Sequence, residues 1–214
     1  MGTNAEWTYM IYMAGENSLS HAGDDDLKEM REVGSSSDVN ILVQFDRGGN
    51  VGTNRYYIQK GGIDEKIESL GGKIDSGDPE TLKGFIDWSS DNYPANRYAL
   101  ILWDHGSGWE PSEIDKKARE LETKNWSFRE VVSLSNKLYK TFFSTTIDKI
   151  FDLDTPRLRA IFIDEGSGHS IDTIELGKVL AHAKEKIGKP LDILGMDACL
   201  MSNLEVAYQA ENHT

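Results

Sequence analysis

Short apolar runs alternate with amphipathic segments along this chain, and the alternation predicts most of its secondary structure. Each run is bounded by Gly, Pro, Asp or Asn and is almost continuously hydrophobic, which is typical of strands inside a parallel sheet. The predicted strands of this kind are residues 7–14, 39–45, 97–103 and 191–196. Residues 53–59 resemble one arm of a hairpin, and residues 158–163 form a further short run.

A first helix is predicted from residue 19, with a cap in the Gly-Glu-Asn-Ser segment at 15–18 and a stop at Gly34. Its apolar positions recur at three-residue spacing and are Leu27, Met30 and Val33. Three consecutive aspartates at 24–26 lie within it. Calcium loops place carboxylates at alternating positions around a glycine turn, so we interpret this triplet as a solvated helix face.

Two more helices are predicted further along the chain. One begins at the Asp-Pro pair of residues 78–79 and ends near Tyr93, and the other runs from residue 172 to about residue 188. Asp172 and Glu175 have the spacing of a capping box. The side chains expected to face the core are Leu82, Phe85, Ile86, Ile174, Val179, Leu180 and Ala183. We expect His169 and His182 to be surface or packing residues, since no metal-ligand spacing accompanies them.

Strand, helix and strand in repetition predict an α/β fold, with an open, mostly parallel sheet that has helices on both faces. The length of 214 residues suits a single domain, residues 1–214, with an irregular segment at about 110–159. The paired glycines at 48–49 could suggest a phosphate-binding loop. They lack the Lys-Ser/Thr ending of such loops, so a plain turn is the favoured interpretation.

Composition excludes some classes of protein and partner but leaves the predicted fold unchanged. Hydrophobic residues make up 38% of the chain and charged residues 28%, as in soluble globular proteins. The net charge of −13 disfavours nucleic acid as a partner and would weakly attract cationic substrates. No apolar run reaches the ~18 residues of a membrane span, and the amino terminus lacks a signal-peptide pattern, which does not exclude export. A single cysteine forbids an internal disulfide.

That cysteine, Cys199, lies where the apolar run at 191–196 gives way to a helical pattern. A lone cysteine is most often a small buried hydrophobe. At a helix N-terminus, however, unpaired backbone N–H groups and the helix dipole would favour the nucleophilic thiolate. Position therefore makes Cys199 a candidate nucleophile that needs a base.

His105 is the candidate base, since it directly follows the apolar run at 97–103. In open parallel sheets functional groups gather at the carboxyl ends of the strands, so His105 and Cys199 would share one crevice if their strands are neighbours. Imidazole could then assist thiolate formation and protonate a leaving amine. The N–H groups of Gly106 and Cys199 are candidates for an oxyanion hole. A purely structural histidine is the alternative.

Four motifs in order resemble the clostripain-like cysteine peptidases, a family with a caspase-like fold. They are the strand at 7–14 with the helix start after it, Val-Gln-Phe-Asp-Arg at 43–47, Leu-Trp-Asp-His-Gly-Ser-Gly-Trp at 102–109 and Met-Asp-Ala-Cys-Leu-Met at 196–201. The resemblance implies that Cys199 is the nucleophile, that His105 is the catalytic histidine, and that peptide bonds are cut after Arg or Lys. It also implies that Asp197 lines the specificity pocket. No metal site is predicted.

A carboxylate at Asp197 suits this role, because it could bind a guanidinium through two hydrogen bonds or a lysine ammonium as a point charge. The alternative is that Asp197 caps the helix after Cys199. Asp104 is beside His105 but stays outside the predicted catalytic set, since neighbouring strand residues point to opposite faces.

The resemblance implies several further expectations. Self-cleavage at a basic residue within 110–159 would activate the enzyme, whereas the alternative for this segment is a plain solvated loop. The chain ends fifteen residues after Cys199, so we expect a C-terminal segment or a second chain to complete the sheet, whose edge would otherwise be exposed. No cofactor is required for the chemistry, calcium is allowed by resemblance, and secretion or a bacterial cell-surface location is expected.

Two competing functions remain at this point. The first is a catalytically silent relative that binds basic peptides in an acidic cleft. The second is a structural Cys199, with glycine turns that bind a sugar or nucleotide, for which the chain offers little support.

Overall fold

The computed structural model describes residues 4–17, 19–48, 50–61, 65–72, 74–104, 169–171, 173–198, 201 and 204–214. These residues belong to one compact unit formed by Met1–Gly108 and Ala160–Thr214. Its strands are β1 (Ala5–Ala14), β2 (Val39–Asp46), β3 (Thr53–Tyr57), β4 (Glu65–Gly71), β5 (Ala95–Trp103) and β6 (Ile193–Asp197). Its helices are α1 (Ser20–Val33), α2 (Pro79–Asn92), α6 (Thr173–Ile187) and α7 (Leu204–Ala210).

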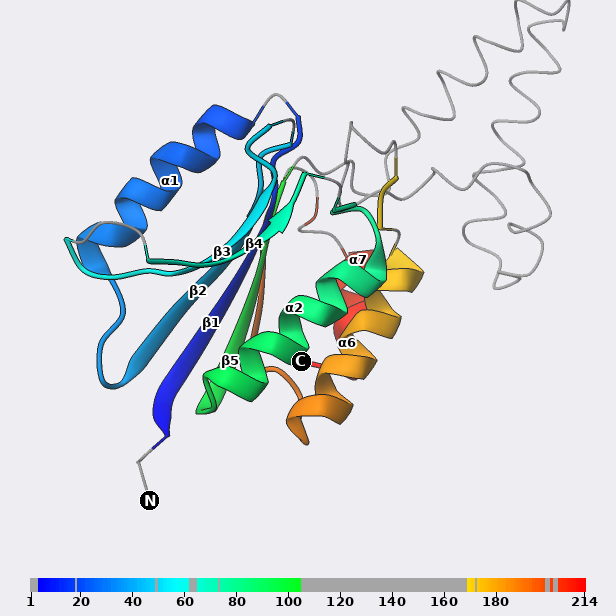
Figure 1. Cartoon of the computed structure of the whole chain (residues 1–214). Coiled ribbons are helices and arrows are strands. Elements are labelled where there is room, and N and C mark those ends of the chain that lie inside the picture. Colours follow the sequence, from blue (N-terminus) through cyan, green and yellow to red (C-terminus); the bar gives the residue numbers. More distant parts are fainter. Residues whose placement is uncertain are drawn as a thin grey trace, which may run out of the picture. The chain divides into compact units, whose positions relative to one another are not determined.

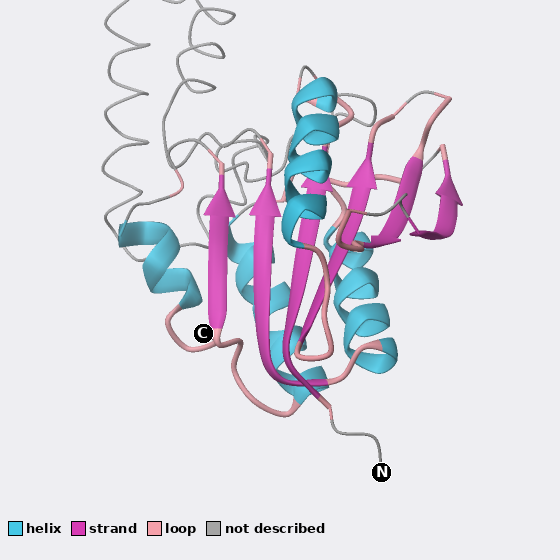
Figure 2. Ribbon diagram, turned by 90° about the vertical axis from the view of Figure 1, so that its left-hand side faces the viewer, coloured by secondary structure: helices cyan, strands magenta, loops and turns pink. Residues whose placement is uncertain are grey.

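The strands form one sheet in the order β4-β3-β2-β1-β5-β6. β2, β1, β5 and β6 are parallel, and β3 and β4 add an antiparallel edge beside β2. The parallel strands therefore end at the same edge of the sheet, as their arrowheads show in Figure 2. The predicted open, mostly parallel sheet is confirmed. β4 was not predicted, because its sequence carries charged residues among few apolar ones and lacks the pattern of a half-buried strand.

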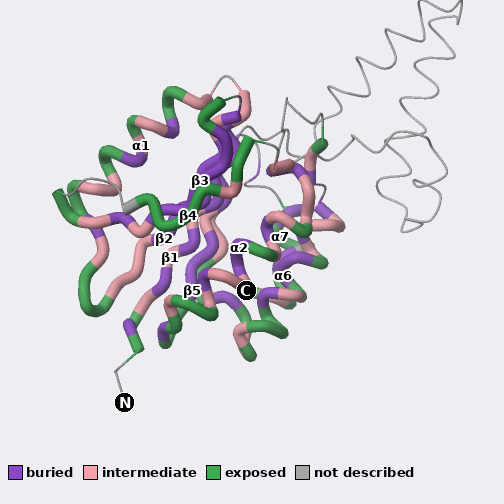
Figure 3. Tube along the Cα trace, viewed as in Figure 1, coloured by how far each residue is buried: buried purple, intermediate pink, exposed green. Residues whose placement is uncertain are grey.

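Helices cover both faces of the sheet, as predicted (Figure 1). Alternate residues of β1 serve the two sides. Met10 and Tyr12 pack in the core that contains α2, α6 and α7, whereas Met13 packs with Leu27 of α1 in a second, smaller core. The buried parts of the chain follow this arrangement, with buried positions along the strands and on the sheet-facing sides of the helices (Figure 3).

The predicted signals for α2 act as expected. The Asp78 carboxylate accepts a hydrogen bond from the Glu80 backbone N–H at 2.9 Å, and Pro79 occupies the first turn, where its missing N–H costs nothing. The apolar stripe of this helix is fully buried, at Leu82, Phe85 and Ile86. The predicted inward residues Val179, Leu180 and Ala183 of α6 are also buried, and this helix ends at Gly188, which adopts a positive φ of 81°.

Two details of the first helix differ from prediction. The N-cap residue is Leu19, one position after the predicted segment, and its own side chain makes no cap hydrogen bond. Within the predicted segment, Asn17 Oδ1 accepts a hydrogen bond from the Leu19 backbone N–H at 2.8 Å. Val33 is 70% exposed rather than packed inward, whereas Leu27 is buried and Met30 packs against the smaller core. Gly34 does end the helix, at a φ of 65° that only glycine adopts without strain.

The three aspartates at 24–26 lie on α1, and Asp24 links that helix to Arg47, which follows β2. The Arg47 guanidinium donates to the Asp24 carboxylate at 2.6 Å and to the Tyr56 hydroxyl at 2.6 Å. Burial alone would lower the pKa of Arg47, but the hydrogen bonds that its guanidinium donates to Asp24 and Tyr56 outweigh burial and raise that pKa. The segment at 158–163 and the predicted cap at Asp172 lie outside the described residues.

Candidate active site

β5 and β6 are adjacent parallel strands, which is the arrangement that the candidate dyad requires. Their register pairs Trp103 with Asp197, and the Asp104 backbone N–H donates to the Asp197 carbonyl at 3.2 Å. His105, Gly106 and Cys199 lie outside the described residues. In the sequence, His105 and Cys199 each follow the Trp103–Asp197 pair by two positions. His105 and Cys199 therefore each follow a strand that ends at the same edge of the sheet.

Asp197 is the last residue of β6, and its position bears on the alternative that its carboxylate caps the following helix. It is exposed at the carboxyl edge of the sheet. α7 begins seven positions later, at Leu204, so Asp197 does not cap that helix and the cap interpretation is wrong. An exposed carboxylate at this edge is available to a cationic group.

The position of α7 also corrects the expectation about the cysteine. The helix begins five positions after Cys199, and Met201 between them is buried and outside the helix. The effect of a helix dipole falls off within its first turn. The start of α7 therefore lies beyond the position that the helix-dipole argument requires.

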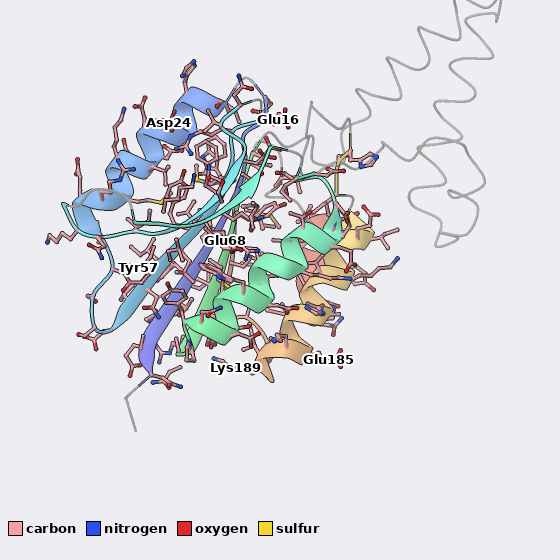
Figure 4. The ribbon with its side chains drawn as sticks, viewed as in Figure 1. Glu16, Asp24, Tyr57, Glu68, Glu185 and Lys189 are labelled. Atoms are coloured by element: carbon pink, nitrogen blue, oxygen red, sulfur yellow. The ribbon has the colours of Figure 1, made fainter. Side chains whose placement is uncertain are left out.

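Asp104 directly follows β5, and the structure shows a contact of its side chain that the sequence did not reveal. Its carboxylate is only 3% exposed and accepts a hydrogen bond from the Asn17 side-chain amide, between Nδ2 and Oδ1, at 2.7 Å. Asn17 lies in the turn between β1 and α1, beside Glu16, which Figure 4 labels at this end of the sheet. The sequence places these two residues 87 positions apart. Only the adjacency of β1 and β5 brings them together.

A second buried carboxylate lies at the end of β2, on the other side of β1 from β5. Asp46 ends β2, is 2% exposed, and accepts hydrogen bonds from the Gly48 backbone N–H at 2.9 Å and from the Ser76 hydroxyl at 2.7 Å. The Tyr12 hydroxyl donates to the Ser76 carbonyl at 3.0 Å. This network joins the turn after β2 to the loop before α2. The glycine at position 48 is thus held as part of a turn, as predicted.

Within the part of the chain that the structure describes, no group of three or more His, Cys, Asp or Glu residues could hold a metal ion. His169 contacts the Asp75 carboxylate, and His182 Nε2 lies 2.7 Å from the Asp87 carboxylate. Both histidines sit on the surface in paired positions, consistent with the roles expected for them. None of the described helices is long and apolar enough to cross a membrane.

The sequence model of the clostripain family matches residues 11–141 and 146–214. The chain belongs to the clostripain family. A curated relative, clostripain of Hathewaya histolytica, is 27% identical over 232 residues, an alignment that covers 96% of this chain and 36% of that protein. The family predicted from the four motifs is therefore confirmed.

Solved structures of clostripain-family (C11) proteases share the fold. A secreted C11 cysteine protease from Bacteroides thetaiotaomicron, solved with an irreversible peptide inhibitor, matches with a TM-score of 0.65 and 24% identity over 98% of this chain and 47% of its own. An inactive zymogen C11 protease from Parabacteroides distasonis matches with a TM-score of 0.65 and 23% identity over 100% of this chain and 47% of its own. The caspase-like fold class is confirmed. The chain spans about half the length of these structures and about a third of the curated relative.

Proposed function

We propose that this chain carries the catalytic dyad of a cysteine endopeptidase that cuts peptide bonds after Arg or Lys. Membership of the clostripain family supports the class of reaction. The observation that carries the proposal is the pairing of β5 with β6, which sends the chain toward His105 and Cys199 from paired positions on neighbouring strands. Side chains that follow a pair of neighbouring strand residues by the same number of positions can act on the same substrate carbonyl group.

The reaction proceeds in two acyl transfers. His105 takes the thiol proton of Cys199, and the sulfur attacks the carbonyl carbon of the scissile bond. The backbone N–H groups of Gly106 and Cys199 stabilise the resulting oxyanion. The C–N bond then breaks, the imidazolium gives its proton to the leaving amine, and a thioester remains. Water attacks the thioester as His105 removes its proton, which returns to the sulfur as the carboxylic acid product leaves.

Asp197 selects the residue on the acyl side of the cleaved bond. Its exposure at the carboxyl edge of the sheet, two positions before Cys199 in the sequence, supports a role in binding a cationic substrate side chain. Arginine would bind it through two parallel hydrogen bonds and lysine through one charge, which favours arginine.

Further properties follow from the family and are part of the same proposal. Self-cleavage at a basic residue within 110–159 would activate the enzyme, a possibility supported by the relative solved as an inactive zymogen. A C-terminal segment or second chain would complete the substrate cleft, and secretion is supported by the secreted relative. Calcium binding belongs to the proposal only through the family resemblance.

Hydrolysis of short arginyl, lysyl and glutamyl amides by the protein that contains this chain tests the proposal. We expect cleavage of the first two substrates, loss of all cleavage in Cys199→Ala and His105→Ala, and a shift away from cationic substrates in Asp197→Asn. If the unmodified protein binds arginyl peptides without cleaving them, the catalytically silent alternative is correct. If self-cleavage occurs, unmodified protein yields two fragments and Cys199→Ala yields none.

A further inference from the structure

The side chain of Asn17 joins its own turn between β1 and α1 to Asp104, which is 87 positions away in the sequence. Its amide nitrogen Nδ2 donates to the Ala14 carbonyl at 3.0 Å and to the Asp104 carboxylate at 2.7 Å, and its oxygen accepts from the Leu19 backbone N–H at 2.8 Å. Ala14 ends β1, Leu19 precedes α1 and Asp104 follows β5. One side chain thus holds together the ends of two neighbouring strands and the start of a helix.

Asp104 is held from a second direction as well. Its backbone N–H donates to the carbonyl of Asp197, the last residue of β6. The main chain of Asp104 is therefore fixed to the strand that leads toward Cys199, while its carboxylate is fixed to the turn after β1. A carboxylate that is 3% exposed is costly to bury, and such a cost is retained where the group has a specific task.

We propose that Asn17 and Asp104 are positioning residues for the dyad. They fix the point at which the chain leaves β5 for His105 relative to the point at which it leaves β6 for Cys199. Asn17 acts through Asp104, and neither side chain touches the reacting atoms. The inference rests on the proposed function, because it assigns these residues a task in that reaction.

Physical reasoning sets the expected size of the effect. A displacement of about 1 Å between reacting groups can cost on the order of a hundredfold in rate. Loss of the Asn17 amide removes the hydrogen bond that restrains Asp104 from the β1 side, while the main-chain pairing of β5 with β6 remains. We therefore expect a partial loss of function, of about tenfold or more, without unfolding.

Alkylation of Cys199 by iodoacetamide measures this effect directly, because the chain has one cysteine and the reaction requires no finished substrate cleft. Rates are compared between pH 5.5 and pH 9 for unmodified protein, Asn17→Ala and Asp104→Ala. Unmodified protein should react near neutral pH much faster than an ordinary thiol, whose pKa is about 8.5. Both variants should lose about tenfold or more of that rate near pH 6.5 and move toward the profile of an ordinary thiol.

A matched control lies on the same strand at the other end of the sheet. The Thr8 hydroxyl donates to the Tyr93 carbonyl at 2.7 Å and accepts from the Asn40 amide at 3.0 Å, so it also links β1 to its surroundings. Thr8→Val should leave the alkylation profile unchanged. The exchange variant Asn17→Asp with Asp104→Asn keeps one amide-to-carboxylate hydrogen bond between the two positions and should recover part of the rate lost in Asn17→Asp, where two carboxylates face each other.

The outcomes separate this inference from the function on which it rests. If Cys199 of the unmodified protein reacts as an ordinary thiol, the proposed function fails and this inference fails with it. If Cys199 is activated but Asn17→Ala and Asp104→Ala keep the unmodified profile, the positioning role is wrong and the proposed function stands. A loss of equal size in Thr8→Val would show that the effect is one of general stability, which also overturns the positioning role.

Discussion

The two ends of the parallel strands are built differently. At the carboxyl end, buried carboxylates terminate β2 and β5, and the described contacts of Asp46 and Asp104 come from neutral donors in the main chain, a hydroxyl and an amide. At the amino end, the surface carboxylate of Asp192 meets β5 and is held by the Lys189 ammonium and the Tyr98 backbone N–H. Lys189 is labelled at this end in Figure 4, far from Glu16 at the other.

The difference indicates which end is adapted for function. A surface ion pair contributes little and costs little, whereas a buried carboxylate needs several well-placed donors to be tolerated at all. A sheet needs no buried charge for its own stability, and the amino end shows a solution without one. At the carboxyl end, next to the candidate dyad, two carboxylates are nevertheless buried, those of Asp46 and Asp104. Substitutions at the two ends can therefore test whether the contrast is real.

The largest effect is expected at Asp46. In Asp46→Ala the Gly48 N–H and the Ser76 hydroxyl lose their acceptor inside the protein, which should lower the free energy of unfolding by about 3 kcal/mol. Asp46→Asn keeps one acceptor oxygen and should cost clearly less. Urea unfolding of both variants measures the difference. A loss in Asp46→Ala no greater than in Asp192→Ala would contradict the contrast between the two ends.

A smaller effect is expected at Thr8, near the amino end of β1. Thr8 is fully buried, and Thr8→Val keeps the shape of the side chain while it removes two neutral hydrogen bonds. We expect a loss of about 1 kcal/mol in the free energy of unfolding, with peptidase activity retained. Unfolding and amide hydrolysis measured on the same preparation check both statements. Loss of activity at unchanged stability would mean that the amino end also serves the reaction.

The smallest effect is expected at Asp192 and depends on pH. Burial alone would raise the pKa of Asp192, but hydrogen bonds from Lys189 and from the Tyr98 backbone N–H outweigh it and hold the pKa below its usual range. A depressed folded-state pKa stabilises the protein above the unfolded-state value of about 3.9, and this contribution is lost as the pH falls through the folded-state pKa.

Asp192→Asn should therefore cost less than about 1 kcal/mol at pH 7, and the difference from the unmodified protein should shrink below pH 4. Thermal unfolding at pH 7 and at pH 3 provides the comparison. A difference that grows on acidification would show that the carboxylate is disfavoured in the folded state.

Much of the fold could be predicted because burial leaves a pattern along the chain. The strands on either side of β1 are rich in apolar residues. Asp78, Gly34 and Gly188 mark helix ends through backbone chemistry that acts locally. The pattern did not predict β4, because an edge strand needs few apolar residues. The sequence did not predict that α7 begins only at Leu204. Residues 199–206 all have a composition typical of helices, so the pattern does not mark where the helix starts.

The candidate site divides in the same way. The motifs pointed to Asp197, and the rule that functional groups gather where parallel strands end pointed to this edge of the sheet. The adjacency of β5 and β6 was only a condition of that prediction, and the structure supplies it. The contact between Asn17 and Asp104 was not predicted, because it joins residues 87 positions apart through side-chain geometry that no local pattern records. An asparagine after a strand looks like any helix cap until the neighbouring strand is known.

The central claim is that Cys199 and His105 form a working dyad with a preference for cationic substrates, and covalent labelling tests it most directly. Peptidyl chloromethyl ketones that end in arginine or in glutamate are incubated with the protein, and labelled Cys199 is quantified by mass spectrometry. The dyad predicts labelling by the arginyl reagent at least about tenfold faster than by the glutamyl reagent, and near-complete loss of labelling in His105→Ala. Equal rates for both reagents, unaffected by His105→Ala, would contradict it.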